Sequence, residues 1–281
     1  MSEFVVDGEV RLVGEVRGEG PTLLLLHGWP DTRNLFDDVL EDFVGAGYRV
    51  AAVDLRGCGE SEKPPATEAY AMHHLVEDVS RVIEHLGGPV TLIGHDWGAA
   101  LAWAVATFRP DLVETLVVLS VGHPSAFRAG GLNQQMKSWY TLLFFHEGVG
   151  EAFLRMEDYG AIRRWLRHPH AEGVIAELER DGQMSAHLRW YRANLPPDAF
   201  VSPPPMLPPV TAPTLGIWSS GDLALTETQM TASEQFCAGG FTYRRLEGLG
   251  HWMVLEAPQL VSSIVLEFLN SSPESKVIMK L

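Results

Sequence analysis

Residues 94–98 of this chain read GHDWG and join two segments of different character. The preceding residues 90–93 (VTLI) form an apolar run typical of a buried strand, and residues 99–108 are alanine-rich and helical in pattern. A G-x-D-x-G turn between a strand and a helix has the form of a nucleophile elbow, with aspartate in the place of the usual serine. The sequence therefore predicts a strand, a sharp turn and a helix that together present Asp96.

The aspartate at the centre of this turn constrains the chemistry. A serine hydroxyl needs a base before it can attack, whereas a carboxylate is already charged at neutral pH. A carboxylate suits displacement at an sp3 carbon, and the ester that results must then be cut by water. We therefore interpret Asp96 as the nucleophile of a two-step hydrolysis.

The bulk composition narrows the class of protein. The 281 residues fit one large α/β domain or a domain with an insertion, and 46% hydrophobic residues are enough for a core. A net charge of −15 disfavours a nucleic-acid partner. No apolar run reaches the roughly 20 residues that span a bilayer, so no membrane partner is expected.

The N-terminal segment and the cysteine content point to a compartment. Residues 1–10 lack the basic and apolar regions of a signal peptide. Cys58 and Cys237 are too few for a disulfide framework. We therefore expect a cytoplasmic protein.

Apolar runs alternate with helical patterns in both outer parts of the chain. Helices are expected at about residues 72–85 and 257–269, and strands at residues 10–16, 22–26, 49–53, 90–93, 114–119, 214–218 and 242–246. This alternation predicts a mostly parallel central sheet flanked by helices, the α/β class.

The alternation of strands and helices stops between residues 124 and 206. The segments there are helical in pattern and rich in aromatic residues, and prolines are frequent near the end. Ligands bind at the carboxyl ends of the strands in open α/β sheets. We therefore expect a helical lid, residues 124–206, inserted above a core formed by residues 1–123 and 207–281.

Two further polar residues follow predicted strands. Asp222 comes just after the strand at 214–218, and His251 just after the strand at 242–246. The chain order of nucleophile, acid and histidine is that of α/β-hydrolase triads. Loops at the same edge of one sheet can bring these side chains together, so Asp96, Asp222 and His251 are the predicted catalytic group.

These motifs resemble those of the α/β-hydrolase family and, within it, of the epoxide hydrolases. The matching segments span most of the chain: residues 27–30 (HGWP), 54–61 (DLRGCGES), 94–98, 221–222 and 250–252. The resemblance implies the α/β-hydrolase fold and conversion of an epoxide to a vicinal diol. It also implies an oxyanion hole formed by the backbone N–H groups of Trp29 and Trp97.

The resemblance further implies a role for two lid tyrosines. Epoxide opening creates an alkoxide, which needs a hydrogen-bond donor, and epoxide hydrolases supply this donor from two tyrosines of the lid. Tyr140 in residues 138–142 (SWYTL) and Tyr191 in residues 189–194 (RWYRAN) resemble those motifs. Packing of the lid onto the core is the alternative role for both aromatic pairs.

The expected substrates are a small apolar epoxide and water, with no cofactor and no metal. The lid is rich in large apolar side chains, some of which are expected to line an apolar pocket: Trp139, Phe144, Phe145, Phe153, Trp165 and Met184. The sequence does not reveal which epoxide is used, or the oligomeric state.

Two other functions stay open at this point. Haloalkane and fluoroacetate dehalogenases share the aspartate elbow, and a tryptophan after the nucleophile, here Trp97, helps to hold halide in the haloalkane enzymes. The second alternative is a non-catalytic, ligand-binding member of the fold.

Overall fold

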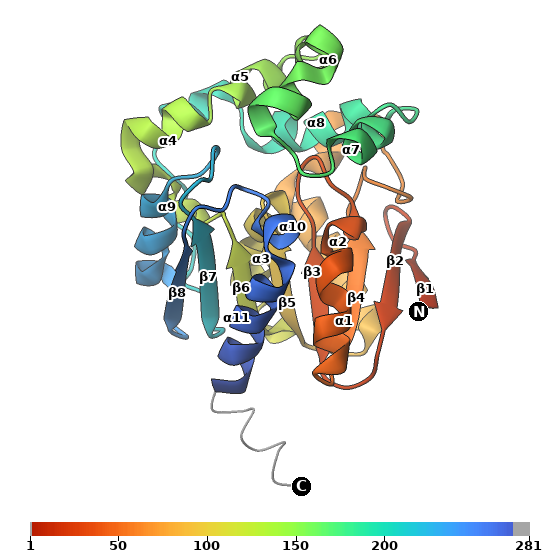
Figure 1. Cartoon of the computed structure of the whole chain (residues 1–281), viewed down its shortest axis with the longest axis vertical. Helices are drawn as coiled ribbons and strands as arrows, with labels where there is room; N and C mark the ends of the chain where they lie inside the picture. The colour runs from red at the N-terminus through yellow and green to blue at the C-terminus, as the bar shows by residue number, and fades with distance from the viewer. Residues whose placement is uncertain (1, 272–281) are drawn as a thin grey trace, which may run out of the picture.

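The structure is a computed structural model, and it describes residues 2–271. Within these residues the centre is an eight-stranded sheet in the order β1-β2-β4-β3-β5-β6-β7-β8 (Figure 1). Strands β1 and β2 run antiparallel to their neighbours and the other pairings are parallel. The strands are β1 (Ser2–Val6), β2 (Leu12–Arg17), β3 (Thr22–Leu26), β4 (Arg49–Asp54), β5 (Val90–His95), β6 (Val113–Leu119), β7 (Thr214–Ser219) and β8 (Phe241–Leu246).

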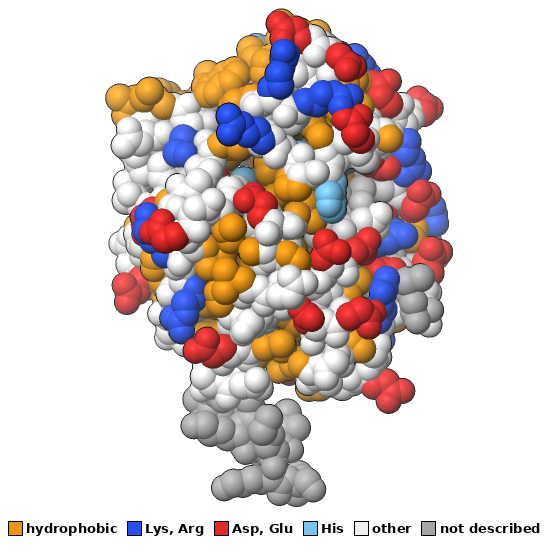
Figure 2. All heavy atoms as spheres, viewed as in Figure 1, with side chains coloured by type: hydrophobic (Ala, Val, Ile, Leu, Met, Phe, Trp, Pro, Cys, Tyr) orange, Lys and Arg blue, Asp and Glu red, His pale blue; other side chains and the backbone are white. Residues whose placement is uncertain are grey.

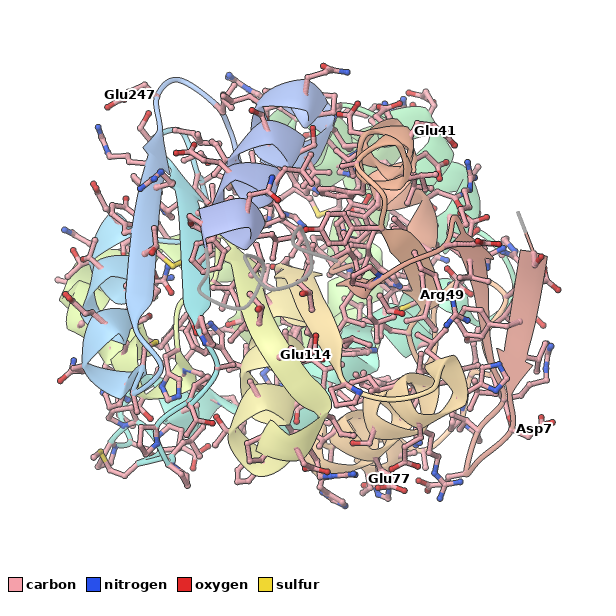
Figure 3. The ribbon with its side chains drawn as sticks, turned by 90° about the horizontal axis from the view of Figure 1, so that it is seen from below. Asp7, Glu41, Arg49, Glu77, Glu114 and Glu247 are labelled. Carbon is pink, nitrogen blue, oxygen red and sulfur yellow. The ribbon has the colours of Figure 1, made fainter. Side chains whose placement is uncertain are left out.

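Helices cover both faces of the sheet. Figure 3 shows the α1 helix, marked by Glu41, on one face and the α2 helix, marked by Glu77, on the other. The strand β3 between these layers is buried along Leu23–Leu26, which explains its unbroken apolar sequence. The helices of the core are η1 (Arg33–Phe36), α1 (Asp37–Gly45), η2 (Thr67–Tyr70), α2 (Met72–Leu86), α3 (Trp97–Phe108), η3 (Pro110–Leu112), α9 (Glu227–Thr231), η7 (Ala232–Phe236), α10 (Met253–Glu256) and α11 (Pro258–Ser271).

The fold confirms the expected α/β class and the predicted strands, with ends that differ by one or two residues. The sequence did not predict the strand β1 or the helices α1, α9 and α10. Strand β1 lies at the edge of the sheet and is half exposed, so its sequence lacks the continuous apolar run of a buried strand.

The lid lies between β6 and β7 in the chain and covers the top of the molecule in Figure 1. In the described residues 124–206 the regular elements are all helical: η4 (Pro124–Gly130), α4 (Gly131–Lys137), α5 (Tyr140–Phe145), α6 (Val149–Gly160), η5 (Ala161–Leu166), α7 (Ala171–Leu178), α8 (Gln183–Asn194) and η6 (Pro197–Phe200). We propose residues 124 and 206 as the boundaries of this lid.

The outer surface of the lid carries exposed apolar side chains. Leu132 and Met136 of α4, Trp139 beside it and Leu142 of α5 are all exposed. Figure 2 shows hydrophobic surface at the top left, over the region of α4 and α5 in Figure 1. Trp139 therefore contributes part of its indole to the surface of the protein. Among the described helices, none is both long and apolar enough to cross a membrane.

Candidate active site

The nucleophile elbow expected from the sequence is a tight turn between β5 and α3. Asp96 occupies it with a φ of 52°, in the left-handed region that favours glycine. A Cβ atom on Gly94 would overlap the backbone of Gly98, and one on Gly98 would overlap the carbonyl oxygen of Leu26. The two flanking glycines are therefore required by close backbone contacts, and they leave Asp96 at the carboxyl end of β5.

The three residues of the predicted triad meet at this edge of the sheet. Nδ1 of His251 lies 2.9 Å from Oδ2 of Asp222, and Nε2 lies 3.5 Å from Oδ2 of Asp96. The other oxygen of Asp222, Oδ1, accepts hydrogen bonds from the backbone N–H groups of Ala224 and Leu225 at 2.8 and 2.9 Å. Asp222 is thus fixed by its own loop and orients the imidazole toward Asp96.

The electrostatics of the group favour a charged imidazole. Burial alone would lower the pKa of His251, but the carboxylates of Asp222 and Asp96 outweigh it and raise that pKa to about 10. Burial also opposes ionisation of Asp222, and contact with the imidazole and two N–H donors holds its pKa below the usual value. The contacts with the two carboxylates therefore favour the imidazolium form of His251 at neutral pH.

The oxyanion-hole candidates contribute unequally in this structure. The backbone N–H of Trp29 donates a 2.8 Å hydrogen bond to Oδ1 of Asp96. Trp97 begins α3, so its N–H belongs to the first helical turn, where N–H groups lack partners within the helix. Oδ1 of Asp96 is therefore held by the core, while Oδ2 faces His251.

Both lid tyrosines lie close to the elbow. Tyr140 on α5 and Tyr191 on α8 have ring centroids 6.1 Å apart, and the Tyr191 ring meets the Trp97 indole edge to face at 5.1 Å. Both side chains are buried. Burial, together with the negative charge of Asp96, raises the pKa of each phenol well above its usual value. The tyrosines are therefore neutral O–H donors.

A cavity of about 640 Å³ opens between the lid and the core. Asp96, Trp97, Tyr140 and Tyr191 line it, and its volume falls in the range of small-molecule sites. The expectation that some of the six named lid side chains would line this pocket is wrong, because none of the six does so. Its apolar wall comes instead from other residues, among them Val121, Phe127, Leu195, Phe200, Leu207 and Leu225.

The lid aromatics that do not line the cavity pack against one another and against the tyrosines. Trp139 packs against Phe153 and Trp165, with ring centroids 5.7 and 5.2 Å apart. Phe144 is fully buried and lies 5.1 Å from the ring of Tyr191. These side chains therefore fix the positions of the tyrosines rather than the shape of the cavity.

One buried polar contact between lid and core was not anticipated. Asp31, just after the HGWP loop, accepts from Nε2 of His168 at 3.0 Å and from the indole N–H of Trp252 at 2.9 Å. Nδ1 of His168 accepts from the backbone N–H of His170, which leaves the proton on Nε2. Asp31 thus links the lid to the loop of His251. No motif in the sequence marks this contact, although Asp31 stands next to one.

The structure also bears on metal binding. Among the described residues there is no group of three or more His, Cys, Asp or Glu side chains that could hold a metal ion.

Comparison with known sequences places the chain among hydrolases. The sequence model of the family described as alpha/beta hydrolase fold matches residues 21–258. Epoxide hydrolase 3 of Xenopus tropicalis is 32% identical over 267 residues, which cover 89% of this chain and 71% of that protein. Epoxide hydrolase 2 of Caenorhabditis elegans is 31% identical, over 95% of this chain and 79% of that protein.

Solved structures give the same grouping. A mutant of an epoxide hydrolase from Bacillus megaterium superposes with a TM-score of 0.85 at 28% identity, covering 96% of this chain and all of that one. An epoxide hydrolase from metagenomes of hot environments superposes with a TM-score of 0.84 at 27% identity, covering 96% and 99% of the two chains. The shared architecture therefore includes both the sheet and the lid.

Proposed function

Because the chain belongs to the alpha/beta hydrolase fold family, with epoxide hydrolases among its relatives, we propose that it hydrolyses an epoxide to a vicinal diol. One observation carries this proposal. Asp96 and the buried phenols of Tyr140 and Tyr191 line the same cavity, and Nε2 of His251 lies 3.5 Å from the carboxylate of Asp96. A nucleophile, two acids and a water-activating base are the groups that the reaction needs.

In the first step, Oδ2 of Asp96 attacks an epoxide carbon while the hydroxyls of Tyr140 and Tyr191 donate to the epoxide oxygen. The new bond joins Oδ2 to carbon, and the carbon–oxygen bond of the ring breaks. The alkoxide takes a proton from the tyrosine pair, which leaves a hydroxyalkyl ester on Asp96. The 2.8 Å hydrogen bond from the Trp29 N–H supports this assignment, because it holds Oδ1 and leaves Oδ2 to react.

In the second step, water cuts the ester. Esterification removes the charge of Asp96, one of the two carboxylates that stabilise the imidazolium of His251. The pKa of His251 therefore falls, and His251 releases a proton. This proton returns to the tyrosine pair, which gave one to the alkoxide in the first step. Neutral His251 then takes a proton from water, and the hydroxide adds to the carbonyl carbon of the ester.

Collapse of the tetrahedral intermediate breaks the bond between the carbonyl carbon and Oδ2, and the leaving oxygen takes the hydroxyl proton of the intermediate. This releases the diol and regenerates the carboxylate, and His251 keeps the other proton of the water as an imidazolium. The oxyanion forms at Oδ1, where the N–H groups of Trp29 and Trp97 are the proposed donors, each typically contributing about 3 kcal/mol. Asp222 keeps the imidazole oriented and stabilises its charged form. The proposed reaction uses no cofactor and no metal, and we propose that it takes place in the cytoplasm.

The tyrosine pair distinguishes this proposal from a dehalogenase. A departing halide needs no proton, whereas a departing alkoxide does. Two buried phenols of raised pKa beside Asp96 favour the second leaving group. We expect diol from a panel of epoxides and no halide from chloroalkanes, bromoalkanes or fluoroacetate. Halide release without diol formation would instead identify a dehalogenase, and tight ligand binding without turnover a binding protein.

A single-turnover experiment in heavy-oxygen water tests the mechanism. If water attacks the ester carbonyl, the label enters the carboxylate of Asp96 in the first cycle and the first diol released is unlabelled. Peptide mass analysis of residues around position 96 measures this. Label found only in that first diol would mean that water attacks the epoxide directly.

A further inference from the structure

The cavity that contains Asp96 also contains a basic side chain. Among the described residues that line it, three are charged: Asp96, Arg128 and Asp198. Arg128 lies near the end of η4 and is half-buried, whereas Asp198 on η6 is exposed. A lone guanidinium on a largely apolar wall, in a chain of net charge −15, calls for a chemical explanation.

Arg128 has no carboxylate partner within the part of the chain that the structure describes. Its Nη2 donates to the carbonyl oxygen of Ala199 at 2.7 Å, and this is the single polar contact that its guanidinium makes with the described residues. The two arginines that are buried in the described chain are each paired with a carboxylate, Arg56 with Asp78 and Arg192 with Glu151. The remaining N–H groups of Arg128 are therefore free to bind an anion.

We propose that Arg128 binds the carboxylate of the substrate, so that the preferred epoxides are amphipathic acids with an apolar chain between carboxylate and epoxide. This inference rests on the proposed epoxide hydrolysis for the identity of the reacting group. The guanidinium fork matches a carboxylate in shape and charge. The apolar wall between lid and core suits the hydrocarbon part.

The contact with Ala199 orients this fork. Gln135 makes a parallel contact, since its Nε2 donates to the carbonyl oxygen of Phe200 at 2.7 Å, and Gln135 also lines the cavity. The two side chains therefore hold consecutive carbonyl groups of the same lid segment, and only one of them is charged. This pair provides a matched control, because loss of Gln135 weakens the segment without removing the charge.

The test compares an epoxy fatty acid with its methyl ester. Arg128→Gln is expected to raise KM for the acid roughly tenfold, the usual value of a charge-assisted hydrogen bond, and to leave KM for the ester within about twofold. Arg128→Lys is expected to keep most of the preference. Gln135→Leu is expected to change the acid and the ester alike. Asp198→Asn is expected to lower KM for the acid, because it removes a like charge from the cavity.

Equal effects of Arg128→Gln on acid and ester would overturn the proposal, since they would reveal a purely structural role. If that variant does not fold, as its unfolding temperature would show, the Asp198→Asn variant decides. A KM for the acid that Asp198→Asn leaves unchanged would also contradict the proposal.

A binding measurement separates this inference from the proposed reaction. An unsaturated fatty acid without an epoxide, and its methyl ester, are titrated against the protein with tryptophan fluorescence as the signal. The acid is expected to bind the native chain about tenfold more tightly than the Arg128→Gln variant. If this difference appears but no epoxide is hydrolysed, the proposed function fails and the anion site stands. If diols form without the difference, only the anion site fails.

Discussion

Nε2 of His251 lies 3.5 Å from Oδ2 of Asp96, the carboxylate oxygen that the Trp29 N–H does not hold. The two oxygens of Asp96 therefore face different partners before any substrate arrives. One is fixed by the core and the other lies between the imidazole and the cavity. This asymmetry assigns each oxygen its part in the proposed reaction, and the predictions that follow depend on it.

Replacement of the proposed nucleophile is expected to remove turnover and to leave the fold intact. Asp96→Ala is expected to lower diol formation by about four orders of magnitude or more, because no other residue can form the ester. Asp198→Ala is the matched control, since Asp198 lines the same cavity away from the elbow and its loss leaves hydrolysis of a neutral epoxide unchanged. Diol formation by Asp96→Ala at the native rate would contradict the ester mechanism.

Removal of the base separates the two steps. His251→Gln is expected to permit attack by Asp96 and to slow the attack of water, so the ester accumulates. Intact-protein mass spectrometry after incubation with an epoxide detects it as an added substrate mass. The double variant Asp96→Ala/His251→Gln controls for alkylation elsewhere. A His251→Gln protein with full turnover and no adduct would exclude the two-step scheme.

We expect the two phenols to contribute to activity more than to stability. The double variant Tyr140→Phe/Tyr191→Phe is expected to lower kcat by about a thousandfold, within the usual range for a positioned acid. Tyr159→Phe is the control, because its hydroxyl is buried in the lid without a hydrogen-bond partner in the described chain and does not line the cavity. Equal activity in the double variant and the control would remove the tyrosines from the mechanism.

The triad makes stability depend on pH in the alkaline range. The pKa of His251 is about 10 in the folded protein and about 6.5 in an unfolded chain. The folded state therefore binds a proton more tightly, and this stabilisation is full below about pH 6.5 and is lost as the pH rises through 10. Thermal unfolding between pH 7 and 10 is expected to show a falling Tm for the native chain. His251→Gln should show a flatter profile, and parallel profiles would argue against a charged imidazole.

The contact between His168 and Asp31 stabilises the lid on the core. His168→Ala is expected to lower the free energy of unfolding by about 2 kcal/mol, because the carboxylate of Asp31 loses a donor in a buried site. Burial alone would raise the pKa of Asp31, but its polar contacts, chiefly the one with His168, hold that pKa below the usual value. The control is His170→Ala. His170 is exposed, and it contacts His168 through its backbone N–H, which the substitution keeps. Equal losses in both variants would mean that the buried contact contributes nothing.

Residues whose positions follow from strand ends could be predicted from the sequence. Asp96, Asp222 and His251 each follow a strand of the parallel sheet, and such strands present their carboxyl ends at one edge. The structure brings these three residues together, as the order of motifs indicated. Their assignment as a catalytic triad stays a proposal until the variants are measured.

Lid contacts could not be predicted in the same way. The sequence pattern of a lid helix does not distinguish a face that lines a cavity from a face that packs in the interior. Phe144 and Trp165 therefore could not be told apart from residues that do line the cavity. The contact of His168 with Asp31 joins residues 137 positions apart, and neither lies at the end of a predicted strand. Arg128 gave no signal either, because a single arginine in a helical segment is ordinary until its surroundings are known.

The two phenols lie on separate helices of the lid, α5 and α8, and the carboxylate of Asp96 lies in the turn between β5 and α3 of the core. Displacement of the lid would thus take both acids away from the nucleophile in one movement. A reactive compound that met Asp96 in that state would find no partner for its oxygen and would leave unchanged. In the proposed reaction, enclosure of the substrate would consequently precede bond breaking, and a molecule too bulky to be enclosed would be rejected before any chemistry begins.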